Sequence, residues 1–187
     1  MAATTTQGTG PGSASNIKPL IINGTVKTLN LESNAVTAPK LDNNALSKAP
    51  VVLDTATQTL NSSYAGIPLV FNRAAGVVVT LPAATGTGDI YKFYVNTTVT
   101  SNSYKIQVEN ATDVICGLAF GDDGDGEPAN AWASGASSDT ITMDGSTQGG
   151  IKGDSVEITD IASGLFSCKV FITQSGTEAT PFSAAVS

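Results

Sequence analysis

The feature that most constrains this chain is an apolar residue at every fifth position between residues 21 and 51. The members of this series are Ile21, Val26, Leu31, Val36, Leu41, Leu46 and Val51. A spacing of five matches neither the 3.6-residue period of a helical face nor the two-residue period of a strand face. Because a single copy offers no regular face on which to bury these side chains, we expect copies of the segment or a partner surface to cover them.

Prolines and paired asparagines interrupt this series and favour an extended arm with short turns. A pentapeptide-repeat β-helix is a rival interpretation of the spacing, and it requires a small residue two positions before each central apolar residue. The positions in question hold Gly24, Leu29, Asn34, Pro39 and Asn44. Since most of these residues are not small and apolar, we set the β-helix aside and assign residues 1–50 to an N-terminal arm.

From Val51 onward, short apolar or alternating runs are separated by glycine-rich turns, which is typical of β-strands. Strands are expected at residues 51–53, 69–71, 77–81, 90–95, 105–108, 114–120, 140–143, 155–158 and 166–173. No segment shows the periodicity of an amphipathic helix. The sequence therefore predicts an all-β domain over residues 51–187, an antiparallel, jelly-roll-like β-sandwich.

The composition disfavours several classes of function. The formal net charge of the 187-residue chain is −7, and no cluster of lysine or arginine offsets it, so we expect no nucleic-acid partner. The longest apolar runs are shorter than the roughly 20 residues that cross a bilayer, so we expect no membrane partner. The first residues lack the basic start and apolar core of a secretory signal, so we expect the protein to fold in a cytoplasm.

Catalysis has little support in the sequence. The chain contains no histidine, the most common general base and metal ligand. Carboxylate pairs such as Asp122/Asp125 or Asp154/Glu157 resemble those of glycosidases, but carboxylates on the turns of a β protein usually form turns and keep the surface soluble. We expect neither enzyme activity nor a cofactor. Cys116 and Cys168 are expected to be buried free thiols, with a bridge between them left as the alternative.

The densest acidic stretch covers residues 121–127 and holds the carboxylates of Asp122, Asp123, Asp125 and Glu127. Calcium binds such oxygens, and the intervening glycines permit a tight loop. The spaced ligands and closing glutamate of an EF-hand are missing, so we expect a solvated acidic loop and no metal, with an ion site as the weaker alternative.

Trp132 is the only tryptophan and lies in a long polar stretch between two expected strands. The simpler interpretation is that it folds this stretch back onto the sandwich. The alternative is an exposed contact with a receptor or a glycan, because aromatic residues are favoured at recognition sites.

About three-quarters of the chain resembles a module found in virion proteins of tailed bacteriophages. The segments that carry the resemblance are residues 77–83 (VVVTLPA), 88–95 (GDIYKFYV), 100–102 (TSN), 139–143 (DTITM), 149–158 (GGIKGDSVEI), 171–177 (FITQSGT) and 180–183 (TPFS). Residues 34–47 (NAVTAPKLDNNALS) are similar to phrases that recur in the stalks of trimeric phage fibres.

The resemblance implies a virion structural protein, most simply a capsid decoration (cement) protein that binds the outer capsid surface as a homotrimer. The implied partners are the major capsid protein, gripped by the apolar series of the arm, and further copies of the chain. The alternative is a head or tail fibre that binds a carbohydrate receptor, with Trp132 at the contact. A bacterial surface or pilus-like β protein is a third, weaker possibility.

Overall fold

The computed structural model describes residues 48–123, 126 and 128–186. Within these ranges the chain forms twelve β-strands and one 3-10 helix, Ser62–Tyr64. The strands are β1 (Val51–Leu53), β2 (Thr57–Thr59), β3 (Pro68–Phe71), β4 (Val77–Thr80), β5 (Ile90–Val95), β6 (Tyr104–Gln107), β7 (Val114–Asp123), β8 (Asn130–Ala133), β9 (Thr140–Met143), β10 (Ser155–Ala162), β11 (Leu165–Gln174) and β12 (Phe182–Ser183).

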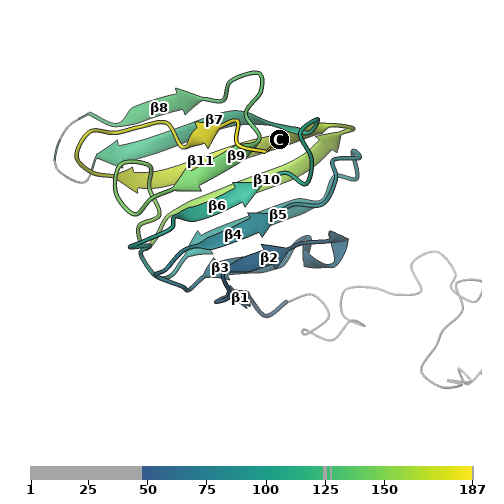
Figure 1. Ribbon diagram of the computed structural model, residues 1–187, viewed down its shortest axis with the longest axis horizontal. Helices are drawn as coiled ribbons and strands as arrows, with labels where there is room; N and C mark the ends of the chain where they lie inside the picture. The colour runs from purple at the N-terminus through teal and green to yellow at the C-terminus, as the bar shows by residue number, and fades with distance from the viewer. Residues whose placement is uncertain (1–47, 124–125, 127, 187) are drawn as a thin grey trace, which may run out of the picture. The chain divides into compact units, whose positions relative to one another are not determined.

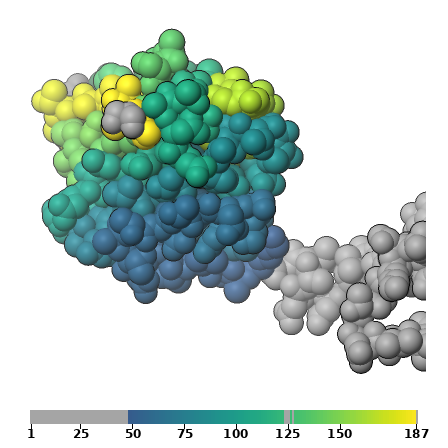
Figure 2. Space-filling model, turned by 45° about the vertical axis from the view of Figure 1, so that its right-hand side comes forward, coloured from purple at the N-terminus to yellow at the C-terminus, as the bar shows by residue number. Residues whose placement is uncertain are grey.

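The strands form two sheets that pack face to face, as Figure 1 shows. The larger sheet has seven strands in the order β1-β3-β5-β10-β11-β7-β8, and the smaller has five in the order β12-β9-β6-β4-β2. In Figure 2 the blue early strands and the yellow C-terminal segment occupy opposite ends of the sandwich, as this order requires. The predicted all-β sandwich is therefore confirmed.

The first six strands alternate between the two sheets, so that the chain winds like a flattened coil. Successive strands in one sheet are consequently parallel: β1 with β3 and β3 with β5 in the larger sheet, and β2 with β4 and β4 with β6 in the smaller. Strands β7 and β11 are also parallel. The prediction of antiparallel sheets was wrong in this respect, because the strand in the opposite sheet supplies the crossover that a parallel pair needs.

The core lies between the sheets and is filled by alternate residues of each strand. In β11, for example, Phe166, Cys168, Val170 and Ile172 point inward and are buried, while the residues between them point outward. Within the core, the ring of Phe71 on β3 stacks with the rings of Phe93 and Tyr104. The centroid distances are 5.7 Å to Phe93 and 4.4 Å to Tyr104. Burial of such alternating apolar residues is the main favourable contribution to the stability of a sandwich.

All nine predicted strands are present, with ends that differ by a few residues. Strands β2, β8 and β12 were not predicted; they are short, and their mixture of polar and small residues carries little strand signal. Residues 121–123 were expected in an acidic loop, but they belong to β7. The reason is that β7 keeps its parallel pairing with β11 as far as the pair Asp123 and Gln174.

The chain divides into two units, Met1–Asn43 and Asn44–Ser187. Six members of the five-residue series, from Ile21 to Leu46, lie outside the described residues, and so their role remains a prediction. Val51, the last member, lies in β1 and packs against the core of the sandwich. Among the residues that the structure describes, no helix is long and apolar enough to cross a membrane.

Candidate interaction surface

The outer faces of the two sheets differ in chemistry. The smaller sheet presents mainly polar side chains, among them Thr80, Lys105, Gln107 and Thr142. Every large apolar side chain that is exposed within the described ranges lies on a strand of the larger sheet. These residues are Val52, Ile90, Tyr94, Leu118, Phe120, Ile161 and Phe171, with exposed fractions between 37% and 55%. An apolar face of this kind on one side of a sandwich is the usual sign of an interaction surface.

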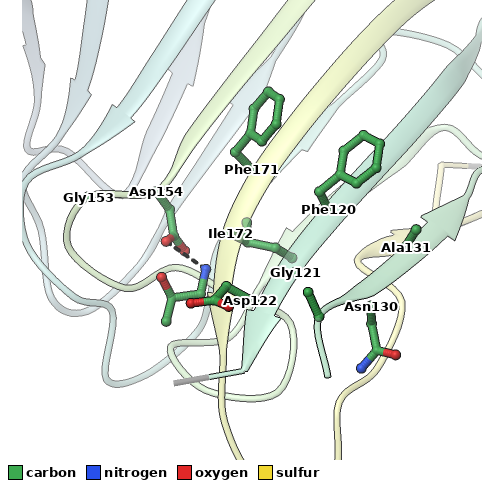
Figure 3. Close-up of a pocket in the computed structure, with 11 residues that line it drawn as sticks. Phe120, Gly121, Asp122, Asn130, Ala131, Gly153, Asp154, Phe171 and Ile172 are labelled. Carbon is green, nitrogen blue, oxygen red and sulfur yellow. Dashed lines mark hydrogen bonds between the residues drawn. The ribbon is translucent and has the colours of Figure 1, made fainter. Parts of the chain in front are cut away.

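One row of side chains crosses all seven strands of the larger sheet. Strand register places the following residues opposite one another in sequence: Val52, Val70, Tyr94, Ser155, Phe171, Phe120 and Ala131. Figure 3 shows Phe171 and Phe120 side by side on β11 and β7, and their rings stack with a centroid distance of 5.8 Å. We call this set the aromatic row. Tyr94 is its one member with an ionisable side chain.

The adjacent row carries charge. Glu157 on β10 lies between Lys92 on β5 and Lys169 on β11, with N–O distances of 3.2 Å and 3.3 Å. Hydrogen bonds from the two ammonium groups hold the pKa of the Glu157 carboxyl below its usual value. Both lysines are well exposed, so these ion pairs add little to the stability of the monomer. Glu157 balances the charge of one of the two lysines, and Asp122 on β7 supplies the second carboxylate of this face.

Two hollows lie on this face, one on each side of Phe171. The larger, of about 510 Å³, has Phe120, Asp122, Asn130 and Thr173 among its lining residues (Figure 3). The smaller, of about 220 Å³, lies between Tyr94 and Phe171 above the charged row. Phe171 therefore stands as a ridge between two depressions.

The buried acidic side chains serve the backbone of the loops. Asp154 accepts hydrogen bonds from the backbone N–H groups of Gly150, Ile151 and Thr173, and burial raises its pKa despite these donors. Asp139 accepts from Ala185 and so fixes the C-terminal segment. Because Asp154 is enclosed at the edge of the core and Glu157 is paired with two lysines, this pair is occupied by structural contacts.

Trp132 lies in β8 and not in a loop. Its indole is half-buried against the core and its Nε1–H donates to Oε1 of Gln174 at 3.1 Å. The side chain of Gln174 is completely buried, so this bond ties β8 to the interior of the sandwich. These contacts favour the packing interpretation of Trp132 over the glycan contact, for which Tyr94, Phe120 and Phe171 are better exposed.

The other candidate residues are placed as follows. Asp122 and Asp123 end β7, whereas Asp125 and Glu127 lie outside the described residues. Within the described ranges, no group of three or more potential metal-ligating side chains is present. Cys116 and Cys168 are free thiols on neighbouring strands. Cys168 is buried as expected, but the expectation was wrong for Cys116, which is exposed because it alternates with the buried Ile115 along β7 and so faces outward. Burial raises the pKa of Cys168 to about 12, so its thiol is unreactive at neutral pH.

The aromatic row was not predicted, although the sequence carries a signal for it. Residues 90–95 and 114–120 are apolar at positions of both parities, and a strand with this pattern has both of its faces covered. The pattern also predicts that β5 and β7 carry apolar side chains on their outer face.

No protein-family model matches this chain, and neither the curated proteins nor the solved structures contain a significant match to it.

Proposed function

We propose that this chain is a structural protein of a tailed-phage virion, a homotrimeric decoration protein on the outer surface of the capsid. Its mechanism is contact: apolar side chains are buried between the protein and its partners, and no bond is made or broken. The single observation that carries the proposal is the concentration of exposed large apolar residues on one face of the sandwich. The sequence segments that resemble phage virion modules supply the choice of assembly.

In this proposal the two parts of the chain have different partners. The apolar series from Ile21 to Leu46 binds the major capsid protein across the joins between its subunits. Extended segments can cover a large surface with little protein mass, and the ordering cost is recovered on binding. The sandwich projects outward. Burial of the arm's apolar residues at these joins resists opening of the shell.

The test is the number of copies of this chain in purified virions, measured by quantitative mass spectrometry against the major capsid protein. We expect a ratio near one copy per capsid subunit, or a simple fraction such as one-third. A ratio of a few copies per hundred capsid subunits would contradict a decoration role and would favour a fibre.

The second candidate is a fibre that binds carbohydrate, and the stacked Phe120 and Phe171 favour it, since Asp122, Asn130 and Thr173 are among the residues that line the adjacent hollow. Sugars present apolar C–H faces that stack on aromatic rings and hydroxyl groups that bond to polar neighbours. The test is titration of the full chain with host surface polysaccharide. This candidate requires that Phe171→Ala abolish binding, while the control Thr142→Ala, on the outer face of the smaller sheet, retains it.

A further inference from the structure

We infer that the outer face of the seven-stranded sheet, centred on the aromatic row, is the surface through which copies of this chain associate. The inference deepens the proposed function, on which it rests for the choice of a homo-oligomer, by naming the surface and its occupant. Four properties of the face support a second copy as that occupant: its size, its relief, its charge and the extent of its apolar side chains.

The size of the face matches that of a stable interface. Strands are spaced at about 4.8 Å, so seven of them are about 29 Å wide, and the ten-residue strands β7 and β11 are about 33 Å long. Since the other strands are shorter, the plan area is on the order of 700 Å². A typical specific interface buries about 800 Å² on each partner. In the proposed trimer, the face of each copy is shared between its two neighbours around the threefold axis.

The relief of the face is suited to contact with itself. When the same surface serves both sides of a contact, it must carry the protruding group and the depression that receives it. Phe171 is 55% exposed and stands between the two hollows, one bounded by Phe120 and the other by Tyr94. The Phe171 ring of one copy can therefore enter a hollow of another.

The charge of the face permits close approach of two copies. The whole chain has a net charge of −7, which opposes association through an arbitrary patch. On the outward positions of the seven strands, among the described side chains, the ionisable residues of opposite sign balance: Lys92 and Lys169 against Glu157 and Asp122. A neutral surface gives no repulsion between copies and no preference for a strongly charged partner.

The extent of the apolar residues favours a protein occupant over a sugar chain. The hollows involve β5, β10, β11, β7 and β8, whereas exposed apolar residues continue to Val52 on β1 at the opposite edge of the sheet. A sugar chain lying in the hollows would leave Val52 and Val70 uncovered. The corresponding faces of the neighbouring copies around a threefold axis cover the whole row.

The test measures the mass of the full-length protein in solution by analytical ultracentrifugation, from nanomolar to high micromolar concentration. For the natural protein we expect the mass of a trimer of the 18.9 kDa chain. Phe171→Asp and Phe120→Asp place a charge at the centre of the proposed contact and are expected to raise the dissociation constant by roughly thirtyfold or more. Thr80→Asp and Thr142→Asp add the same charge to the other outer face and should leave the mass unchanged.

A second measurement does not depend on any substitution. Cys116 is exposed on the same face, next to Ser167 and two positions before Leu118 on β7. If copies cover this face, the rate at which Cys116 reacts with a thiol reagent should fall as the protein concentration rises.

The aspartate variants need a control for folding. Circular dichroism of each variant shows whether a lower mass in the ultracentrifuge reflects dissociation of a folded chain or unfolding.

Three outcomes would overturn the inference. The first is a natural protein that is monomeric at every concentration, and the second is an oligomer that persists in both Phe171→Asp and Phe120→Asp. The third is a rate of Cys116 reaction that does not depend on protein concentration. A monomer that binds polysaccharide through Phe171 would assign the face to a glycan. The copy number in virions is a separate result, so a face-dependent oligomer that is scarce in virions would contradict the decoration role and leave this inference standing.

Discussion

Asp160 illustrates how this chain uses an acidic residue as a structural anchor. The carboxylate is almost completely buried and accepts hydrogen bonds from the backbone N–H groups of Thr85, Gly86 and Thr87, at 3.1, 2.7 and 3.0 Å. The hydroxyl of Thr87 donates a further bond. Burial disfavours the ionised form, but these donors outweigh it and lower the pKa of Asp160. One side chain thereby fixes the loop that leads from β4 into β5.

Replacing Asp160 with asparagine should destabilise the protein. The amide has one acceptor oxygen and its NH₂ group faces backbone donors, so at least one buried N–H loses its partner. We expect a loss of about 1–3 kcal/mol in the free energy of unfolding, measured by urea denaturation. Glu109→Gln, which removes a charge from an exposed position, is the matched control and should change little. Equal effects of the two substitutions would mean that net charge, and not the anchor, is responsible.

The comparison of the natural protein with Asp160→Asn also gives a prediction about pH. Because the pKa of Asp160 is lowered in the folded state, its contribution to stability is present above the unfolded value near 3.9 and is lost as pH falls through the folded value. The difference in stability between the natural protein and Asp160→Asn should therefore shrink as the pH is lowered below about 4. Asp144 and Glu157, whose pKa values are also lowered, titrate in both proteins and cancel in this comparison. A difference that stays constant from pH 7 to pH 3 would contradict the assigned role.

The sequence identified acidic residues as turn formers but not the loops that they anchor. The donors to Asp160 lie 73 to 75 positions away in the chain, and no local pattern relates such distant residues. The aromatic row has the same origin. Its members other than Ala131 lie on strands whose apolar character is visible, but their alignment depends on the register of seven strands.

At the scale of elements, the strands themselves could be predicted and their partners could not. Alternating or apolar runs located nine strands, because burial of one face imposes a period of two. The same period occurs in parallel and antiparallel pairs, so it gave no indication that β7 pairs with β11 in parallel. Strand β8 was missed because Asn130 and two alanines dilute its signal, and Trp132 was consequently assigned to a loop.

Gln174 connects several of these elements through one buried side chain. Its Oε1 accepts from Trp132 on β8, and its Nε2 donates to the backbone carbonyls of Thr147 and Ala179. Gly121 on β7 provides the space, since a Cβ at that position would overlap the amide oxygen of Gln174.

Gln174→Ala should therefore cost about 2–3 kcal/mol in the free energy of unfolding, because it leaves buried donors and acceptors unpaired. Trp132 is the only tryptophan, so its fluorescence should shift to longer wavelength as β8 loosens. Gln107→Ala, on the outer face of the smaller sheet, is the control. If Gln174→Ala and Gln107→Ala unfold at the same urea concentration, the buried hydrogen bonds of Gln174 do not stabilise the sandwich.

At the scale of the whole molecule, the described sandwich closes its core within the second unit, Asn44–Ser187. A fragment of residues 44–187 should therefore melt within about 2 °C of the full chain. A fragment of residues 55–187 lacks β1 and the buried Leu53, and should lose at least 2–3 kcal/mol by the usual cost of removing a buried leucine. Differential scanning calorimetry measures both. A large loss of stability in the longer fragment would show that residues 1–43 support the sandwich.

The coiled path of the first six strands has a consequence for how the domain comes apart. Since the chain passes from one sheet to the other at each step, neither sheet is a continuous piece of chain that can detach alone. To separate one sheet, the strands that alternate with it in the chain must also leave the other sheet. Local excursions that expose a single sheet are thus suppressed, and amide hydrogens of β4 and β5 should exchange with one shared opening free energy. Because the two sheets open together, a force applied at the surface of the sandwich is resisted by the stability of the whole domain and not by that of a single strand.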